Sequence, residues 1–248
     1  MKTSFDLRCI GMAAAVLLFA AQPAAADVLY DPATNTLPSA QSWLTLGTPG
    51  YTQSVGGGAY TLNTTLVNDV KAGSSLFNLT ALDSVAGFKL DFNLRIASEA
   101  HSSTDRAGFS LIVTGADPAQ ALELGFWGDR VFAYTATFAR GSEALFATSL
   151  ATDYSLVVRN NQYTFSGGGA KLLSGALVDY SAKGSPYTLP GFLFFGDDTT
   201  RAQSLTEMGV VSLAAVPEPA TGGLLLAGLA GLAFVRRLGV SGAFRGAR

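Results

Sequence analysis

Four side chains in a short stretch are suited to binding a sugar. Trp127, Asp129 and Arg130 lie within four positions, and Tyr134 follows on the next expected strand. Aromatic faces stack on sugar rings, and an acid and an arginine can hydrogen-bond to hydroxyl groups. We therefore predict a ligand-binding site at this turn. The alternative is that Trp127 only packs on the second face of a sheet.

Two adjacent acids, Asp197 and Asp198, form a second candidate site. They follow the apolar run 192–195 and precede two threonines. Carboxylate, hydroxyl and backbone oxygens are the ligands that calcium prefers, so the pair is a candidate calcium site. The alternative is a turn or cap in which the aspartates bond to nearby backbone groups. No other cofactor is expected.

The chain lacks the residues and motifs that most hydrolases use for catalysis. The one histidine, His101, lies in a polar stretch that we expect to be a solvated loop, and the one cysteine is Cys9. No G-x-S-x-G, H-E-x-x-H or phosphate-binding glycine motif is present. A retaining glycosidase needs two carboxylates about 5–5.5 Å apart, but Glu123 has Gly125 and Trp127 at its alternating positions. We predict a protein that is not an enzyme, with a polysaccharide-active glycosidase as the alternative.

The charge of the central part of the chain excludes one class of partner. Residues 27–219 contain ten Lys and Arg against seventeen Asp and Glu, a net charge of −7. An acidic domain lacks the positive surface that binds a phosphate backbone, so nucleic acid is not expected as a partner. The same stretch has no cysteine, which excludes disulfides and thiolate metal sites there.

Apolar and polar residues alternate along the central part of the chain. In 88–96, the five apolar residues share one face of an expected strand, with polar residues between them. Shorter alternating runs occupy 109–113, 122–126 and 154–158. Gly128-Asp129 and Asn160-Asn161 suit tight hairpins because these residues tolerate positive φ. We predict an all-β fold, a single antiparallel β-sandwich over 27–215.

Four segments in this order resemble the concanavalin-like and laminin-G-like jelly rolls. They are residues 106–113, 122–126, 154–158 and 194–199. The resemblance implies a jelly-roll sandwich of the "choice-of-anchor" kind, an exported domain with an interchangeable C-terminal anchor. Some jelly rolls hydrolyse polysaccharides, and the glycosidase alternative therefore takes this form.

The N-terminus has the features of a secretory signal peptide. Two basic residues precede an uncharged stretch over 9–21, and Ala24 and Ala26 stand before Asp27. A positive head, an apolar middle of about 7–15 residues and an A-x-A site define such a peptide. We expect signal peptidase to cleave after Ala26 and remove residues 1–26.

The C-terminus combines a proline-flanked acid, an uncharged segment and an arginine pair. The residues are Val216, Pro217, Glu218 and Pro219, then 220–235, then Arg236 and Arg237. A helix over 220–235 spans roughly 24 Å, and terminal arginines can reach outward to complete a membrane span. Basic residues stay inside, so we expect a transmembrane helix with a cytoplasmic tail over 238–248 and the main domain outside.

This order of features resembles the PEP-CTERM sorting signal over residues 216–237. The resemblance implies recognition by an exosortase, a membrane transpeptidase of Gram-negative bacteria, and cleavage near the Pro-Glu-Pro. Such bacteria usually make exopolysaccharide and biofilm matrix. One departure is the tail over 238–248, which is longer than the family habitually carries. The alternative is an ordinary C-terminal membrane helix.

Taken together, the two ends and the central domain predict an exported protein. We expect it to be anchored in the cell-envelope membrane, then displayed at the cell surface or in the extracellular matrix. Its sandwich would have a non-catalytic binding or structural role linked to exopolysaccharide or biofilm, with polysaccharide as a candidate partner.

We predict processing at both ends. N-terminal sequencing of the mature protein should begin at Asp27, and a start at Met1 or at an internal residue would contradict export as argued. Glu218→Ala should leave an uncut, membrane-bound form on immunoblots of cell fractions. Identical release of the wild type and this variant would contradict the sorting assignment.

Overall fold

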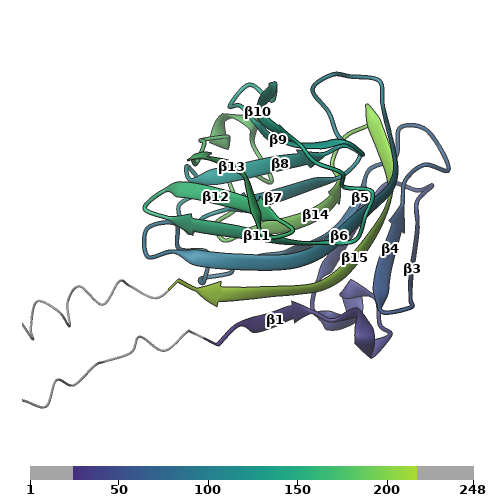
Figure 1. The fold of residues 1–248 in the computed structure, drawn as a ribbon, viewed down its shortest axis with the longest axis horizontal. Helices are drawn as coiled ribbons and strands as arrows, with labels where there is room; N and C mark the ends of the chain where they lie inside the picture. The colour runs from purple at the N-terminus through teal and green to yellow at the C-terminus, as the bar shows by residue number, and fades with distance from the viewer. Residues whose placement is uncertain (1–24, 217–248) are drawn as a thin grey trace, which may run out of the picture. The chain divides into compact units, whose positions relative to one another are not determined.

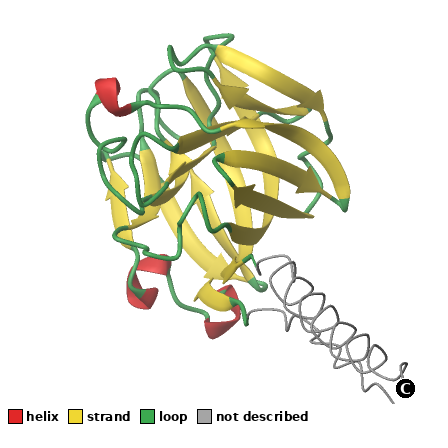
Figure 2. Ribbon diagram, turned by 90° about the vertical axis from the view of Figure 1, so that its left-hand side faces the viewer, coloured by secondary structure: helices red, strands yellow, loops and turns green. Residues whose placement is uncertain are grey.

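Two antiparallel β-sheets, packed face to face, make up the part of the chain that the computed structural model describes, residues 25–216 (Figure 1). The only helices in this range are three short 3-10 turns (Figure 2), and none is long and apolar enough to cross a membrane. The predicted all-β antiparallel sandwich is therefore confirmed. The predicted signal peptide up to residue 24, the helix over 220–235 and the tail over 238–248 lie outside the described residues.

Sheet A has eight strands, seven of them in the order β13-β12-β11-β6-β15-β4-β3, while β1 also pairs with β15. The strand bounds are β1 (Asp27–Tyr30), β3 (Thr52–Gly56), β4 (Ala59–Asn63), β6 (Phe88–His101), β11 (Thr152–Arg159), β12 (Gln162–Gly167), β13 (Ala170–Ala176) and β15 (Ala202–Ala215). The longest pairing joins β6 to β15, each of 14 residues. These two strands form the centre of the sheet.

Sheet B has seven strands in the order β10-β9-β8-β7-β14-β5-β2. The bounds are β2 (Leu44–Gly47), β5 (Ala72–Leu76), β7 (Ser110–Thr114), β8 (Ala121–Phe126), β9 (Arg130–Tyr134), β10 (Arg140–Leu145) and β14 (Leu193–Asp197). The 3-10 turns are η1 (Pro32–Thr34), η2 (Pro38–Gln41) and η3 (Ser181–Lys183).

The alternation predicted for 88–96 is present in β6. Its five apolar side chains are buried, and the polar residues between them are partly or fully exposed. Phe92 lies at the centre of the core, with its ring 5.1 Å from that of Phe195 and 5.4 Å from that of Tyr154. Because Phe195 belongs to β14 of sheet B, this contact joins the two sheets.

The hairpin predictions are also confirmed. Asn160 and Asn161 connect β11 to β12 with φ angles of 50° and 57°, and Gly128-Asp129 lies between β8 and β9. The loop expected around His101 begins later than predicted. β6 continues through His101, which pairs with Ala202 of β15, and the polar stretch leaves the strand only after this residue. His101 is exposed, as expected.

Sheet B carries apolar side chains on both faces. Leu111 and Val113 of β7 point into the core between the sheets, while Ile112 belongs to a second cluster on the outer face. Successive side chains of a strand point to opposite faces, so β14 does the same with Phe195 and Phe194. The segment 177–191 packs Tyr180 and Tyr187 onto this outer face. Burial on both faces gives β7, β8 and β14 nearly continuous buried runs.

This core makes a prediction about stability. Phe92→Ala should lower the free energy of unfolding by about 3–5 kcal/mol, because it removes a buried ring and leaves a cavity. Asp91→Ala should cost at most about 1 kcal/mol, since Asp91 only forms a surface ion pair with Lys89. Urea unfolding of both variants measures the difference, and equal costs would mean that the two faces of β6 are equally buried.

Candidate functional site

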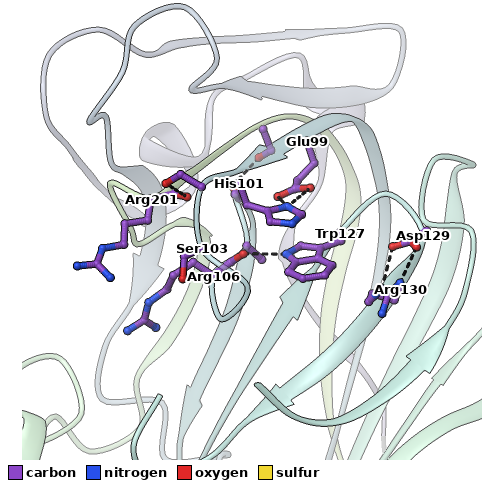
Figure 3. A network of polar contacts seen from close by, with 12 residues as sticks. Glu99, His101, Ser103, Arg106, Trp127, Asp129, Arg130 and Arg201 are labelled. Carbon is purple, nitrogen blue, oxygen red and sulfur yellow. Dashed lines mark hydrogen bonds and ion pairs between the residues drawn. The ribbon is translucent and has the colours of Figure 1, made fainter. Parts of the chain in front are cut away.

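Trp127 follows β8 and is only 7% exposed. Its ring stacks on that of His101, with the centroids 3.9 Å apart and the planes at 6° (Figure 3). The guanidinium of Arg140 lies 4.7 Å from the ring centroid, and the indole Nε1 donates to the Arg106 carbonyl at 2.7 Å. A sugar could therefore stack on Trp127 only if a neighbouring side chain moved.

Asp129 and Arg130 lie beside Trp127 and bind each other. Arg130 donates to both Asp129 oxygens at 3.0 and 2.9 Å, which lowers the pKa of that carboxyl. Glu143 lies 3.4 Å from Arg130 and 3.3 Å from Arg140. The structure thus brings three of the four predicted ligand residues together, but their charges are already paired.

Tyr134, the fourth predicted ligand residue, lies away from this group. It is 2% exposed within the outer cluster of sheet B, and its hydroxyl accepts from the Ala107 N–H at 3.2 Å. Arg106 connects the two places. Its carbonyl binds Trp127, while its guanidinium lies 5.5 Å from the ring centroid of Tyr134 and 5.1 Å from that of Phe138.

A hollow with a volume of about 820 Å³ lies on the outer face of sheet B. We call it the outer cleft. Its aromatic residues are Phe138, Tyr187, Phe192 and Phe194, its cations are Lys71, Arg106 and Arg201, and Asp197 and Asp198 complete its charged groups. Pockets of about 300–1,000 Å³ with apolar walls and a few polar groups are typical of small-molecule sites.

A glycine shapes the floor of the outer cleft. Gly73 of β5 lies under the ring of Phe194, and a Cβ atom at this position would come within 2.4 Å of that ring. The same Cβ atom would lie 2.6 Å from the carbonyl oxygen of Phe195, so a larger residue would displace the ring or the neighbouring strand. The glycine therefore allows the ring of Phe194 to lie directly against β5.

The side chains of the two predicted calcium ligands bond to different partners. Asp197 is 1% exposed and accepts from Thr64 Oγ1 at 2.8 Å and from the Thr199 N–H at 3.1 Å. Asp198 instead accepts from Ser110 Oγ at 3.0 Å, on the side of the sheet that carries Ile112 and the outer cleft. Within residues 25–216, no group of three or more His, Cys, Asp or Glu side chains is arranged to hold a metal ion. Calcium binding by this pair stays a prediction.

Glu123 is a fully buried acid beneath the outer cleft, with 0% exposure. The Tyr187 hydroxyl donates to its Oε2, whereas its Oε1 has no hydrogen-bond partner among the described residues. Burial, and then the charge of nearby Asp198, raise the pKa of Glu123 well above its usual range. Burial also raises the pKa of Asp198 and that of Asp197, the latter to about 8.

Sequence reasoning missed most residues of the outer cleft. Phe138, Tyr187 and Lys71 come from loops and a strand edge far apart in the chain, so no local spacing joins them. One signal was available, because the unbroken apolar run 192–195 cannot be explained by a strand with one buried face. It marks a strand that is covered on both faces.

The fold is that of a galectin-like β-sandwich. A protein with a galectin-like fold from Bacillus subtilis superposes with a TM-score of 0.52 at 11% identity, covering 80% of this chain and 99% of that one. The carbohydrate esterase vb_24B_21 of the Shiga toxin-encoding bacteriophage phi24B gives a TM-score of 0.56 at 12% identity, covering 77% and 99%. At these identities the likeness concerns the fold.

Residues 215–237 match the PEP-CTERM protein-sorting motif. The chain therefore carries this sorting signal, as predicted for 216–237, and the signal indicates an exported protein that is processed at the membrane of the cell envelope. No curated protein sequence matches the chain.

The buried acids make a prediction about pH. A carboxyl whose pKa is raised in the folded state contributes most stability below its unfolded pKa of about 4.3, and this stability is lost as pH rises toward the folded pKa. The melting temperature should therefore fall between about pH 5 and pH 8. Glu123→Gln removes the titrating group and keeps an acceptor for Tyr187. The melting temperature of this variant should therefore fall less than that of the wild type over the same pH range, by about 3 °C or more.

Scanning calorimetry across this pH range measures the effect. Glu143→Gln is the matched control, because it makes the same change at an exposed position of β10, and its curve should run parallel to that of the wild type. Parallel curves for Glu123→Gln and the wild type would show that Glu123 does not hold its proton in the folded protein.

Proposed function

We propose that this protein binds carbohydrate in the outer cleft and does so as a non-catalytic surface or matrix protein. The observation that carries the proposal is the composition of the cleft: four aromatic rings beside charged and hydroxyl groups, in a volume of about 820 Å³. Aromatic rings pack against the apolar faces of sugars, and polar groups at their edges bind hydroxyls. The galectin-like fold and the carbohydrate esterase among the similar structures are in keeping with such a ligand.

The outer cleft replaces the Trp127 turn as the proposed place of binding. Trp127, Asp129 and Arg130 are engaged with one another and with His101 and Arg140. In the cleft, by contrast, Phe138 is partly exposed and lies beside Arg106. A ligand can reach these groups without first breaking ion pairs.

The two ends of the chain support a location outside the cell. We propose that signal peptidase removes residues 1–26 and that the helix over 220–235 anchors the protein in the membrane of a Gram-negative cell envelope. Exosortase then processes it at the sorting motif of residues 215–237. A carbohydrate-binding domain delivered in this way fits a role in exopolysaccharide or biofilm matrix.

A glycosidase is the alternative, and the nearness of Glu123 to Asp198 favours it. Two carboxyls that differ in environment are what such an enzyme uses as acid and base. Of these two carboxyls only that of Asp198 lines the cleft, however, while Glu123 is fully buried and bonded to Tyr187. A substrate cannot contact Glu123 in this arrangement, which is why we propose binding without hydrolysis.

Affinity electrophoresis in gels containing exopolysaccharide of the producing bacterium tests the proposal. The wild type should be retarded, and Phe138→Ala should weaken binding about threefold to tenfold, because it removes an aromatic wall of the cleft. Leu145→Ala, which truncates a 76% exposed side chain on β10, is the control and should bind like the wild type.

Two results would count against this function. Retardation that is the same for Phe138→Ala and the wild type would place binding outside the cleft. Reducing ends that accumulate with the wild type but not with Asp198→Asn would show hydrolysis and favour the glycosidase.

A further inference from the structure

The cations of the outer cleft form no ion pair among the described residues, although Arg106 and Lys71 interact with the charge of Asp198. Lys71, Arg106 and Arg201 line the cleft, yet the ion pairs within 25–216 all involve other cations. Arg106 instead rests on the rings of Tyr134 and Phe138. The side chains of Arg106 and Arg201 extend to the same side, away from Trp127 (Figure 3). This leaves their donors available to a ligand.

The acids nearest to these cations are turned to other partners. Asp197 bonds to Thr64 and Thr199, and Asp198 bonds to Ser110. Burial raises the pKa of both carboxyls, against the opposite effect of Lys71 on each and of Arg106 on Asp198. Neither carboxyl forms an ion pair with a cation of the cleft among the described residues. Within an acidic domain, the cleft thus gathers three cations that belong to no described ion pair.

The positive groups stand beside an aromatic surface. Phe138 lies under Arg106, with Lys183 5.1 Å from the same ring, and Phe194 forms part of the floor. Unpaired guanidinium and ammonium groups bind carboxylates through charge-assisted hydrogen bonds. An aromatic surface binds the apolar face of a pyranose ring. A sugar chain that carries carboxylates would engage both kinds of group.

We infer that the outer cleft binds an acidic saccharide, a sugar chain that carries carboxylates in the manner of a uronic acid. Its carboxylate meets Arg106 together with Lys71 or Arg201, and its ring packs against Phe138. This inference rests on the proposed carbohydrate-binding function and specifies the ligand's charge. It also explains how a domain with a net charge of −7 can hold an anionic polymer, since the positive groups are gathered at the site itself.

Isothermal titration with two probes of equal length tests the inference. The probes are trigalacturonate and the same trisaccharide after reduction of its carboxyls to alcohols. The wild type should bind the acidic probe about tenfold more tightly or better. Raising the salt from about 50 to 500 mM should reduce this preference.

Variants in the full-length mature protein identify the groups responsible. Arg106→Gln should lower affinity for trigalacturonate about tenfold and bring the two probes within about threefold of each other. Lys71→Gln, on an exposed residue just before β5, should act in the same direction without disturbing the fold. Lys171→Gln removes an equal charge from β13 of the other sheet and should change nothing.

The outcomes separate this inference from the function on which it rests. Equal binding of both probes by the wild type, or no loss in Arg106→Gln and Lys71→Gln, would overturn the acidic-ligand assignment while leaving carbohydrate binding intact. Equally tight binding of a single-stranded oligonucleotide of the same charge would also overturn it. Failure of both probes, together with exopolysaccharide binding that is unaffected by Phe138→Ala, would remove the proposed function itself.

Discussion

Sheet B is covered by apolar side chains on both faces, and the place and chemistry of the outer cleft depend on this double burial. Tyr180 and Tyr187 of the 177–191 segment pack on its outer face, and the cleft is lined by Tyr187 together with residues of β2. Polar groups beneath the cover have lost water and need partners within the protein. Tyr187 supplies one to Glu123, and Ser110 supplies one to Asp198.

The two ends of the outer face of sheet B differ in whether their charged side chains form ion pairs. Near Trp127, Arg130 and Arg140 are matched by Asp129 and Glu143 in a closed set of ion pairs. In the outer cleft the buried Asp197 and the partly exposed Asp198 bond to hydroxyl groups, while Arg106 belongs to no described ion pair. Matched charges stabilise a surface and attract little, whereas unmatched ones create a local field that a ligand can satisfy. Function is therefore expected where the pairing is incomplete.

The sandwich was predictable because strand alternation and turn residues are local signals. The pattern of β6 and the Asn160-Asn161 turn depend on neighbours in the chain, and both were found as expected. The outer cleft was not predictable in the same way, since Lys71, Phe138 and Tyr187 meet only through the pairing of distant strands. Trp127 was predicted as a ligand residue from its type and its spacing from Arg130, and neither could reveal that His101 would stack on it. The sorting motif depends on contiguous residues and was found from the sequence.

The pairing of β1 with β15 has a mechanical consequence. Asp27 lies opposite Leu213, so the first strand of the domain and its last run antiparallel, side by side (Figure 1). A pull on the chain beyond Ala215 acts along β15, which is bonded to β6 on one side and to β1 and β4 on the other. Such a force loads these ladders in shear, so that many hydrogen bonds share it and must break together. A domain pulled in this way would be loaded through its longest ladder, and the outer cleft, on the other sheet, would not lie in the line of force.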